Sequence, residues 1–400
     1  MLQSIRNYLV VTGGYWAFTV TDGAIRMLVV LYFHQLGYSP FEVAMLFLFY
    51  EFFGIVTNLV GGWLGARIGL NLTMHIGMMM QVVALAALTV PDAWLSVPYV
   101  MAAQALSGIA KDLNKMSAKA SVKVMADDGS QSKLFRWVAV LTGSKNALKG
   151  AGFFAGAALL EWLGFRSALG LLAGMLFVVL VITAIMLPSG VGKMKSKPKF
   201  TQVFSRVEAI NWLSAARFFL FGSRDIWFVV GLPVFLYEVL GWSFIEVGSF
   251  LALWVIGYGF VQASAPRLVK RSHHGQGPGG DTARFWVFLL ALFPAGIALG
   301  LQYGWPADAV LIIGLILFGI VFAINSAVHS YLILAYSDHD KVAMNVGFYY
   351  MANAGGRLVG TMISGWAYQT QGLVGCLWWS TAFVLLAALL SFRLPDLKEA

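Results

Sequence analysis

The stretch "ALGLLAGMLFVVLVITAIML", residues 168–187, contains no Asp, Glu, Lys or Arg. An α-helix of this length extends about 30 Å, which is the thickness of the hydrocarbon core of a bilayer. The run is about twice as long as the roughly 10-residue alternating strands of an outer-membrane barrel. It therefore predicts a transmembrane helix. Its length is the guide for dividing the rest of the chain into candidate spans.

The whole chain has the composition of a membrane protein. Of its 400 residues, 59% are hydrophobic and only 11% are charged, whereas about a quarter of the residues of a soluble domain are charged. Division at clusters of Gly, Pro and charged residues gives twelve candidate spans. They are 8–34, 41–64, 72–90, 96–118, 137–160, 167–187, 209–238, 244–265, 285–302, 308–336, 345–369 and 373–392. We expect an all-α membrane protein of twelve transmembrane helices.

The loop charges predict the orientation and exclude several functions. Arg166 is the only Lys or Arg in the loops on the side opposite the N-terminus, so the positive-inside rule predicts cytoplasmic termini in the inner membrane. Because Cys376 is the single cysteine, an internal disulfide and a Cys-rich metal site are excluded. Because there is no domain-sized polar stretch, we expect no nucleic-acid binding, no enzymatic activity and no cofactor or metal.

A short motif occurs twice, at corresponding positions. "LGYSPFEV" at 36–43 follows the first span, and "LGWSFIEV" at 240–247 follows the seventh. Internal repeats of this kind build many transporters, although a chance match of short loop sequences would look the same. With the basic linker between them, the repeats predict an N-terminal six-helix half (1–187), a cytoplasmic linker (188–208) and a C-terminal six-helix half (209–400).

Charged residues inside the spans are the main functional signal. A charge at the bilayer centre costs at least about 2.5–3.5 kcal/mol, so such residues usually face a cavity or a partner. The bases are Arg26, Lys111, Lys115, Lys145, Lys149, Arg217, Arg224 and Arg357, and the acids are Asp22, Glu51, Asp112 and Asp225. The third, sixth, ninth and twelfth spans carry none of these residues, as expected for helices that face lipid. The excess of bases over acids predicts an interior that binds an anion.

We assign candidate roles to these residues as follows. The predicted substrate-binding residues are Arg26, Lys145, Lys149, Arg224 and Arg357, with Lys111 and Lys115, and the acids Asp22, Glu51, Asp112 and Asp225 are candidates for proton or charge coupling. Asn325 and His329 share one face of the tenth span and either line the cavity or form hydrogen bonds between helices. In the alternating-access mechanism that we expect, Arg26 and Arg224 hold one anionic group, and Lys145, Lys149 and Arg357 hold the other.

Local pairing is the alternative to substrate binding. Asp22 with Arg26, and Asp112 with a lysine one turn away, are spaced so that they could neutralise each other on their own helices. Asp225 follows Arg224 directly, and adjacent residues diverge by about 100° around a helix. We therefore expect that these two do not pair.

The architecture and one motif resemble the major facilitator superfamily. The superfamily signature between the second and third helices is Gly-x-Leu-x-Asp-Arg-x-Gly followed by two basic residues, and it corresponds to "GWLGARIGLN" at 62–71. Gly62, Leu64, Arg67 and Gly69 fit, whereas Ala66 replaces the acid, and Leu70 and Asn71 replace the basic pair. The resemblance implies a secondary transporter, in which the charged loop gate of the family is altered.

A narrower resemblance is to the ArsJ family of organoarsenical efflux permeases. It rests on residues 7–69, on "AKDLNKMSAKASVK" at 110–123 and on "GSKNALKG" at 143–150. The resemblance implies export of 1-arseno-3-phosphoglycerate, which forms when glyceraldehyde-3-phosphate dehydrogenase uses arsenate instead of phosphate, and hence a functional partnership with that enzyme and arsenate resistance. Import or antiport of organophosphate or phosphate-type anions is the alternative. We expect the protein to be a monomer in the lipid bilayer. Two modes of transport stay open, which are proton antiport through Asp22 or Glu51 and uniport.

Overall fold

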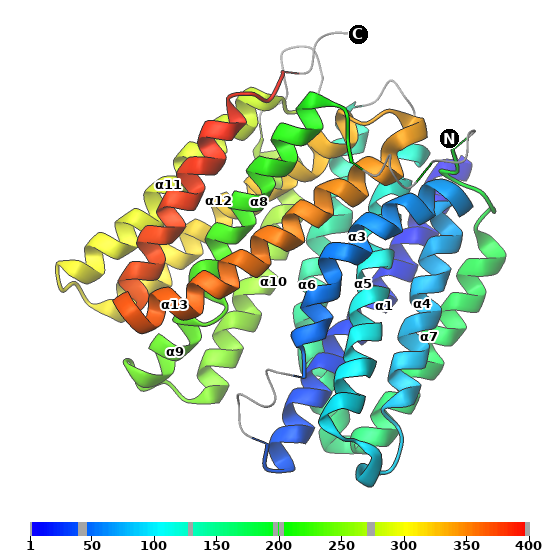
Figure 1. Ribbon diagram of the computed structural model, residues 1–400, viewed down its shortest axis with the longest axis horizontal. Coiled ribbons are helices and arrows are strands. Elements are labelled where there is room, and N and C mark those ends of the chain that lie inside the picture. Colours follow the sequence, from blue (N-terminus) through cyan, green and yellow to red (C-terminus); the bar gives the residue numbers. More distant parts are fainter. Residues whose placement is uncertain are drawn as a thin grey trace. The chain divides into compact units, whose positions relative to one another are not determined.

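The computed structural model describes residues 2–38, 46–126, 131–194, 199, 204–269 and 277–396. Almost all of them are helical (Figure 1). The helices are α1 (Leu2–Gln35), α3 (Leu48–Ile68), α4 (Leu70–Ala87), α5 (Val97–Met125), α6 (Gln131–Leu163), α7 (Phe165–Met186), α8 (Glu208–Phe228), α9 (Gly231–Glu238), α10 (Phe244–Leu268), α11 (Gly280–Gln302), α12 (Ala307–Ala335) and α13 (Val342–Ser391), with short 3-10 turns η1 (Asp92–Trp94) and η3 (His339–Lys341). Part of the first repeat copy, at 36–43, lies outside the described residues.

Among the described residues, each predicted span overlaps helical structure, with two differences in detail, and residues 41–45 of the second span lie outside the described part of the chain. The span 209–238 is divided into α8 and α9, because Pro233 has no N–H to donate to the carbonyl of Val229 four residues earlier. The last two spans form α13, within which Gly372 adopts φ +66° and turns the chain. Among the described residues, eight helices are long and apolar enough to cross a membrane, and one of these covers both of the last two spans.

The chain forms two compact units. The first comprises Met1–Asp128, Ser144–Phe204 and Ser337–Met351, and the second comprises Gly129–Gly143, Ser205–Tyr336 and Ala352–Ala400. Helices α6 and α13 thus contribute residues to both units. Apart from these segments, the first unit is built from α1 to α7 and the second from α8 to α13.

Glycines allow the helices of the first unit to approach closely at the level of the buried charges. A Cβ at Gly23 on α1 would lie 2.7 Å from the carbonyl oxygen of Lys149 on α6. A Cβ at Gly108 on α5 would lie 2.8 Å from the Cα of Tyr50 on α3. Since real Cβ atoms do not come this close, both crossings depend on glycine.

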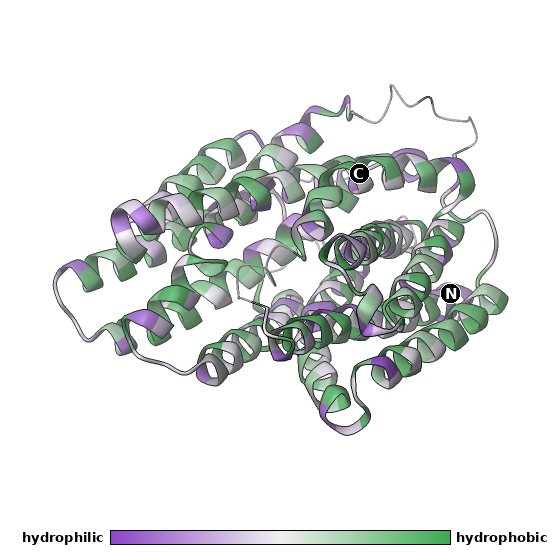
Figure 2. Cartoon of the chain, turned by 60° about the horizontal axis from the view of Figure 1, so that its bottom comes forward, coloured by the Kyte–Doolittle hydropathy of each residue, from purple (hydrophilic) through white to green (hydrophobic). Residues whose placement is uncertain are grey.

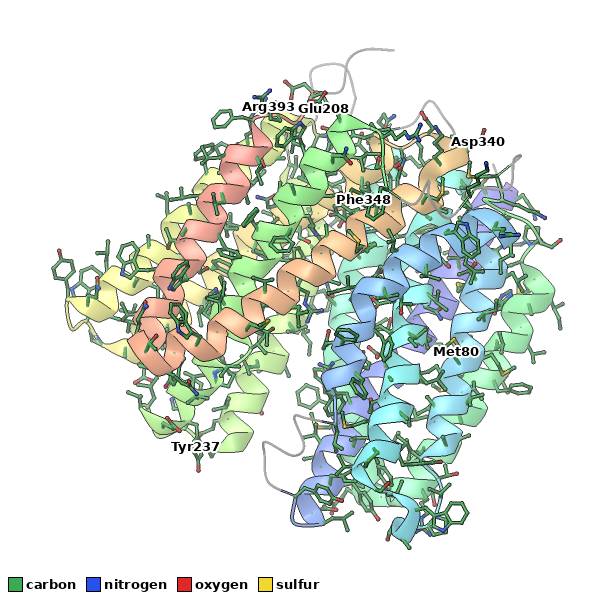
Figure 3. All side chains as sticks on the ribbon, in the orientation of Figure 1. Met80, Glu208, Tyr237, Asp340, Phe348 and Arg393 are labelled. Atoms are coloured by element: carbon green, nitrogen blue, oxygen red, sulfur yellow. The ribbon has the colours of Figure 1, made fainter. Side chains whose placement is uncertain are left out.

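The second unit has the same kind of close approach between α8 and α13. A Cβ at Gly360 would lie 2.5 Å from the carbonyl oxygen of Gly222. At one end of this unit, Glu208 and Arg393 lie beside each other (Figure 3), and both contact Trp212. The Glu208 carboxylate accepts a hydrogen bond from the Trp212 indole over 3.0 Å, and the Arg393 guanidinium lies 5.6 Å from the centre of the indole ring.

Hydrophobic residues make up most of the helices, and hydrophilic residues are found mainly toward the helix ends (Figure 2). Helix α7, which contains the stretch quoted at the start, has large apolar side chains exposed along its length, including Phe177, Val178, Ile182 and Ile185. This exposure is expected of a helix that faces lipid, because lipid chains replace water as the neighbour of such side chains.

The turn between α3 and α4 is held by the start of the predicted linker. Gly69 forms the turn with φ +105°. The N–H of Leu70 donates to the carbonyl of Val191, and the side-chain amide of Asn71 donates to the carbonyl of Pro188, both over 2.8 Å. The N–H of Met194 donates to the carbonyl of Ala66 over 2.8 Å. Backbone hydrogen bonds from residues 188–194 therefore occupy the position where the family signature has charged side chains.

Candidate functional site

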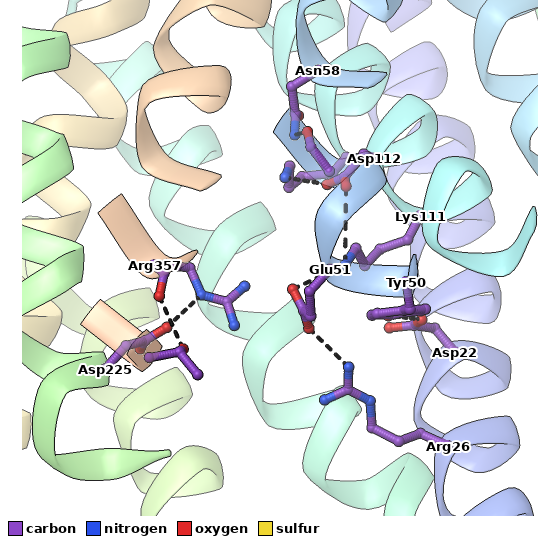
Figure 4. A network of polar contacts seen from close by, with 12 residues as sticks. Asp22, Arg26, Tyr50, Glu51, Asn58, Lys111, Asp112, Asp225 and Arg357 are labelled. Carbon is purple, nitrogen blue, oxygen red and sulfur yellow. Dashed lines mark hydrogen bonds and ion pairs between the residues drawn. The ribbon is translucent and has the colours of Figure 1, made fainter. Parts of the chain in front are cut away.

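The first unit contains a connected network of charged side chains (Figure 4). Its members come from four helices: Asp22 and Arg26 on α1, Tyr50 and Glu51 on α3, Lys111, Asp112 and Lys115 on α5, and Lys149 on α6. We call this set the first-unit network. It brings together seven of the residues that the sequence predicts, and it adds Tyr50.

Arg26 pairs with Glu51, not with Asp22. Its guanidinium lies 2.9 Å from a carboxylate oxygen of Glu51, and the ammonium of Lys111 lies 3.9 Å from the other oxygen. Local pairing of Asp22 with Arg26, which the sequence left open as the alternative, is therefore not found. The long side chain of Arg26 reaches Glu51 on α3, so Arg26 is paired without Asp22 on its own helix.

Asp22 instead joins α1 to α3 and α6. Its side chain is 3% exposed, and one carboxylate oxygen lies 3.4 Å from the ammonium of Lys149. The hydroxyl of Tyr50 donates a short hydrogen bond to the other oxygen. Because Gly23 lets α1 contact the backbone of α6 at Lys149, the carboxylate and the ammonium are fixed at the same level.

Tyr50 is the member of the network that the sequence analysis did not identify. The ammonium of Lys111 lies 3.8 Å from the centre of its ring, and the guanidinium of Arg26 lies 4.7 Å from it. The face of an aromatic ring attracts cations. Tyr50 thus separates two bases while its hydroxyl holds Asp22, and its position directly before Glu51 in the sequence is the signal that could have indicated it.

Two further predicted bases of the first unit are Lys115, which belongs to the network, and Lys145, which lies on α6. Lys115 lies 2.5 Å from Asp112 on its own helix, so the expected local pair is found here. The ammonium of Lys115 also lies 4.5 Å from the ring centre of Tyr350. Lys145 is half-buried on α6, one turn before Lys149.

In the second unit, one carboxylate is shared by two arginines. Asp225 on α8 is fully buried and accepts a hydrogen bond from Nε of Arg357 on α13 over 2.8 Å (Figure 4). It also accepts a hydrogen bond from Nε of Arg224 over 2.7 Å. The expectation that Arg224 and Asp225 do not pair is wrong. Their Cα–Cβ bonds diverge, but the arginine side chain is long enough to bend back toward its neighbour.

Three aromatic rings of the apolar core lie beside Arg224. Its guanidinium lies 5.2 Å from the ring centre of Phe221, 5.7 Å from that of Phe322 and 5.8 Å from that of Phe228. Such contacts offset part of the cost of burying a cation. We call Arg224, Asp225 and Arg357 the second-unit cluster.

Arg217, Asn325 and His329 lie in the buried interior of the second unit. Nε of Arg217 donates to the side-chain oxygen of Asn353 over 2.9 Å, and its Nη1 donates to the hydroxyl of Ser326 over 3.2 Å. Asn325 and His329 are fully buried on α12, and no hydrogen-bond partner for their side chains is found within the described part of the chain. Their expected role as cavity-lining residues stays a prediction.

Taken unit by unit, the sites carry more positive than negative charge. The first-unit network has four bases, Arg26, Lys111, Lys115 and Lys149, and three acids. The second-unit cluster has two arginines and one aspartate. Among the residues described, no group of three or more His, Cys, Asp and Glu side chains is placed to hold a metal ion. The chemistry that these sites offer is electrostatic binding of an anion.

Comparison with known proteins identifies relatives of the fold. The family profile "Major Facilitator Superfamily" matches residues 11–301, which is more than half of the chain. A search of curated proteins finds no match.

Several solved structures are similar over nearly the whole chain. A bacterial homologue of the iron transporter ferroportin, in its outward-facing state, aligns with a TM-score of 0.78 and 16% identity over 97% of this chain and 98% of its own. The human organic anion transporter MFSD10 aligns with a TM-score of 0.77 and 16% identity over 97% and 99%. The proton:xylose symporter XylE aligns with a TM-score of 0.74 and 14% identity over 98% and 96%. These likenesses confirm the predicted fold class.

Proposed function

Because the chain belongs to the major facilitator superfamily, and is thus a multi-pass secondary transporter, we propose that it exports an organic polyanion and that its substrate is 1-arseno-3-phosphoglycerate. The sequence resemblance to the ArsJ organoarsenical efflux permeases supports this substrate. The proposed consequence is arsenate resistance, since the exported compound leaves the cell with its arsenic. In this proposal, glyceraldehyde-3-phosphate dehydrogenase is the enzyme that supplies the substrate.

The observation that carries the proposal is the second-unit cluster. Arg224 and Arg357 both contact the fully buried carboxylate of Asp225. A guanidinium presents a planar set of donors that fits carboxylate, phosphate and arsenate oxygens equally well. In our proposal, an oxyanion group of the substrate takes the place of the Asp225 carboxylate beside the two arginines.

The first-unit network supports the same substrate class. In our proposal, the cations are grouped by unit, which replaces the grouping of Arg26 with Arg224 expected from the sequence. Lys149 and Arg26 bind an oxyanion group in the first unit, with Lys145 one turn away on α6 as a further cation. Lys111 and Lys115 are assigned a lesser role, because Asp112 contacts both. A substrate with a phosphate at one end and an arsenate ester at the other carries two oxyanion groups, and the cations of either unit suit a group of this kind.

The single cysteine argues against transport of trivalent arsenic. Arsenite binds thiolates, and such sites need several soft ligands. Cys376 is fully buried in the apolar core of the second unit, where its neighbours are apolar side chains. The cations, not the thiol, are therefore the groups that would recognise arsenic, in its oxyanion form.

The membrane potential can drive this export. Moving one elementary charge through 100 mV corresponds to about 2.3 kcal/mol. Because the interior of the cell is negative, export of an anion is favoured by this free energy for each negative charge. Uniport thus needs no coupled ion. Proton antiport would require that protonation of Asp22 or Glu51 releases Lys149 or Arg26, which each of these acids contacts.

Transport into everted membrane vesicles tests the proposal. Vesicles are given glyceraldehyde-3-phosphate dehydrogenase, its substrate, NAD⁺ and arsenate, so that the unstable organoarsenical forms outside, and arsenic is then measured inside. We expect uptake by the wild type and at least tenfold less uptake by Arg224→Gln at equal protein level. Arg393→Gln, which removes a cation that contacts Trp212, is the matched control and should transport normally.

Competition separates the proposed exporter from a general organophosphate carrier. Excess 3-phosphoglycerate should compete only weakly with the organoarsenical, since a smaller carboxylate with a single negative charge stands where the organoarsenical has its arsenate group. Uptake that is unaffected in Arg224→Gln contradicts the assigned site. Equal transport of 3-phosphoglycerate would instead favour an organophosphate importer or antiporter.

A further inference from the structure

The second unit contains a cavity that plays no part in the proposed transport site. It has a volume of about 450 Å³ and lies between the first turns of α6 and the last turns of α10. Its lining includes Ser132 and Arg136 from α6 and Ser264 and Arg267 from α10. Pockets of roughly this volume hold small ligands or molecular headgroups.

The polar part of the cavity suits a phosphate group. Arg136 and Arg267 bring two guanidinium groups to it from two helices, and Ser132 and Ser264 bring two hydroxyls. No Asp or Glu is found among the described residues that line it. Ser132 also lies in the first turn of α6, which contains no acidic residue, and the N-terminal end of a helix favours negative charge.

The remainder of the lining is apolar and partly exposed. Phe135 is buried at the α6 side, whereas Phe260 on α10 is 65% exposed. Leu253 and Leu268, seven residues before and eight residues after Phe260, are also exposed. This spacing places the three side chains on one face of α10. The cavity thus joins a cationic centre to an apolar helical surface.

We propose that this cavity binds the phosphate headgroup of an anionic phospholipid, whose acyl chains lie along the exposed apolar face of α10. The charged end of the cavity is on the side that carries most basic loop residues, and we expect this side to face the cytoplasm. Basic pockets between transmembrane helices on that side are suited to anionic headgroups. Free phosphate would use the same arginines but would gain nothing from Phe260.

Native mass spectrometry of the detergent-purified protein tests the site with phosphatidylglycerol, phosphatidylcholine and inorganic phosphate as probes. We expect the wild type to retain phosphatidylglycerol in preference to phosphatidylcholine. The double variant Arg136→Gln/Arg267→Gln should bind phosphatidylglycerol about thirtyfold more weakly, because each cation near an anionic lipid surface contributes about 1 kcal/mol. Arg393→Gln, which removes one cation outside the cavity, should bind like the wild type.

Two further variants keep the test independent of folding. Arg136→Lys/Arg267→Lys preserves both charges and should retain most of the binding, and Phe260→Ser should weaken phosphatidylglycerol binding without affecting inorganic phosphate. Unchanged phosphatidylglycerol binding by the double Gln variant, eluting as a folded monodisperse species, overturns the proposal. Displacement of phosphatidylglycerol by millimolar inorganic phosphate also overturns it and identifies a free-phosphate site. None of these readouts depends on arsenical transport.

Discussion

The guanidinium of Arg357 on α13 donates a hydrogen bond over 2.8 Å to the carboxylate of Asp225, which is fully buried on α8. The contact joins the two helices at the point where Gly222 and Gly360 let their backbones approach. Arg224 donates to the other carboxylate oxygen. One acid therefore contacts two bases, and this shared contact makes Asp225 the residue whose removal is most informative.

Replacement of Asp225 by Asn should destabilise the protein and make it more responsive to anions. Loss of one partner from a buried ion pair costs about 3–5 kcal/mol, and here two arginines lose a charged acceptor. Thermal unfolding in detergent should show a lower midpoint for Asp225→Asn than for the wild type. Added 3-phosphoglycerate should raise that midpoint more in the variant, because the anion takes the place of the carboxylate.

The control for this experiment is Asp308→Asn, which removes an exposed carboxylate from the first turn of α12. It should shift neither the midpoint nor its response to anions appreciably. If Asp225→Asn and the wild type respond to 3-phosphoglycerate equally, the carboxylate does not occupy an anion position.

A double-mutant cycle on Asp22 and Lys149 should reveal direct coupling between α1 and α6. Their charged atoms lie 3.4 Å apart, and the carboxylate is almost completely buried. Asp22→Asn and Lys149→Gln should each lower the unfolding midpoint. The double variant should lower it by less than the sum of the two single effects. Coupling energies for contacting residues are about 0.5–3 kcal/mol.

The matched comparison is the cycle of Asp22→Asn with Lys145→Gln, one turn away on the same helix. Additive effects are expected there. In transport assays, Lys149→Gln should be inactive, and normal arsenical uptake by this variant would exclude Lys149 from the substrate site.

The helices were predictable because their signal is local. A run such as residues 168–187 needs no partner to be recognised, since its length and lack of charge follow from the thickness of the bilayer. The break between α8 and α9 also has a local signal, Pro233, which the division into spans did not use.

The pairing of charges was not predictable in the same way. Arg26 contacts Glu51, 25 residues away, in preference to Asp22 on its own helix. Which acid meets which base depends on how the helices cross, and residue spacing within one helix does not contain that information. The hydrogen bonds from residues 188–194 to the α3–α4 turn are likewise tertiary contacts of backbone groups, which side-chain patterns do not report.

Alanine at Gly23 should disrupt the crossing of α1 and α6, whereas alanine at Gly13 should be tolerated. A Cβ at Gly23 would lie 2.7 Å from the carbonyl oxygen of Lys149, whereas a Cβ at Gly13 has no neighbour within 4 Å. Both glycines lie on α1, so the intrinsic gain in helix propensity, about 1 kcal/mol, is the same for both. Folded yield by fluorescence-detected size-exclusion chromatography should fall for Gly23→Ala only. A similar loss for both variants would show that close packing at Gly23 is not the cause.

The stability of the connection between α4 and α5 should depend on the ionisation of Asp92. Its carboxylate accepts hydrogen bonds from the hydroxyl of Tyr32 over 2.7 Å and from the guanidinium of Arg166 over 2.9 Å, and these contacts lower the pKa of Asp92 below its ordinary value. A group with a lowered pKa stabilises the folded state above its unfolded pKa, about 3.9, and this contribution is lost as the pH falls through the folded pKa. At pH 7, Asp92→Asn should therefore lower the unfolding midpoint slightly, since the site is exposed, and the difference from the wild type should shrink as the pH falls below about 4. Glu161→Gln, at an exposed position of α6, provides the control, and a difference between Asp92→Asn and the wild type that persists unchanged at pH 3 would contradict the assignment.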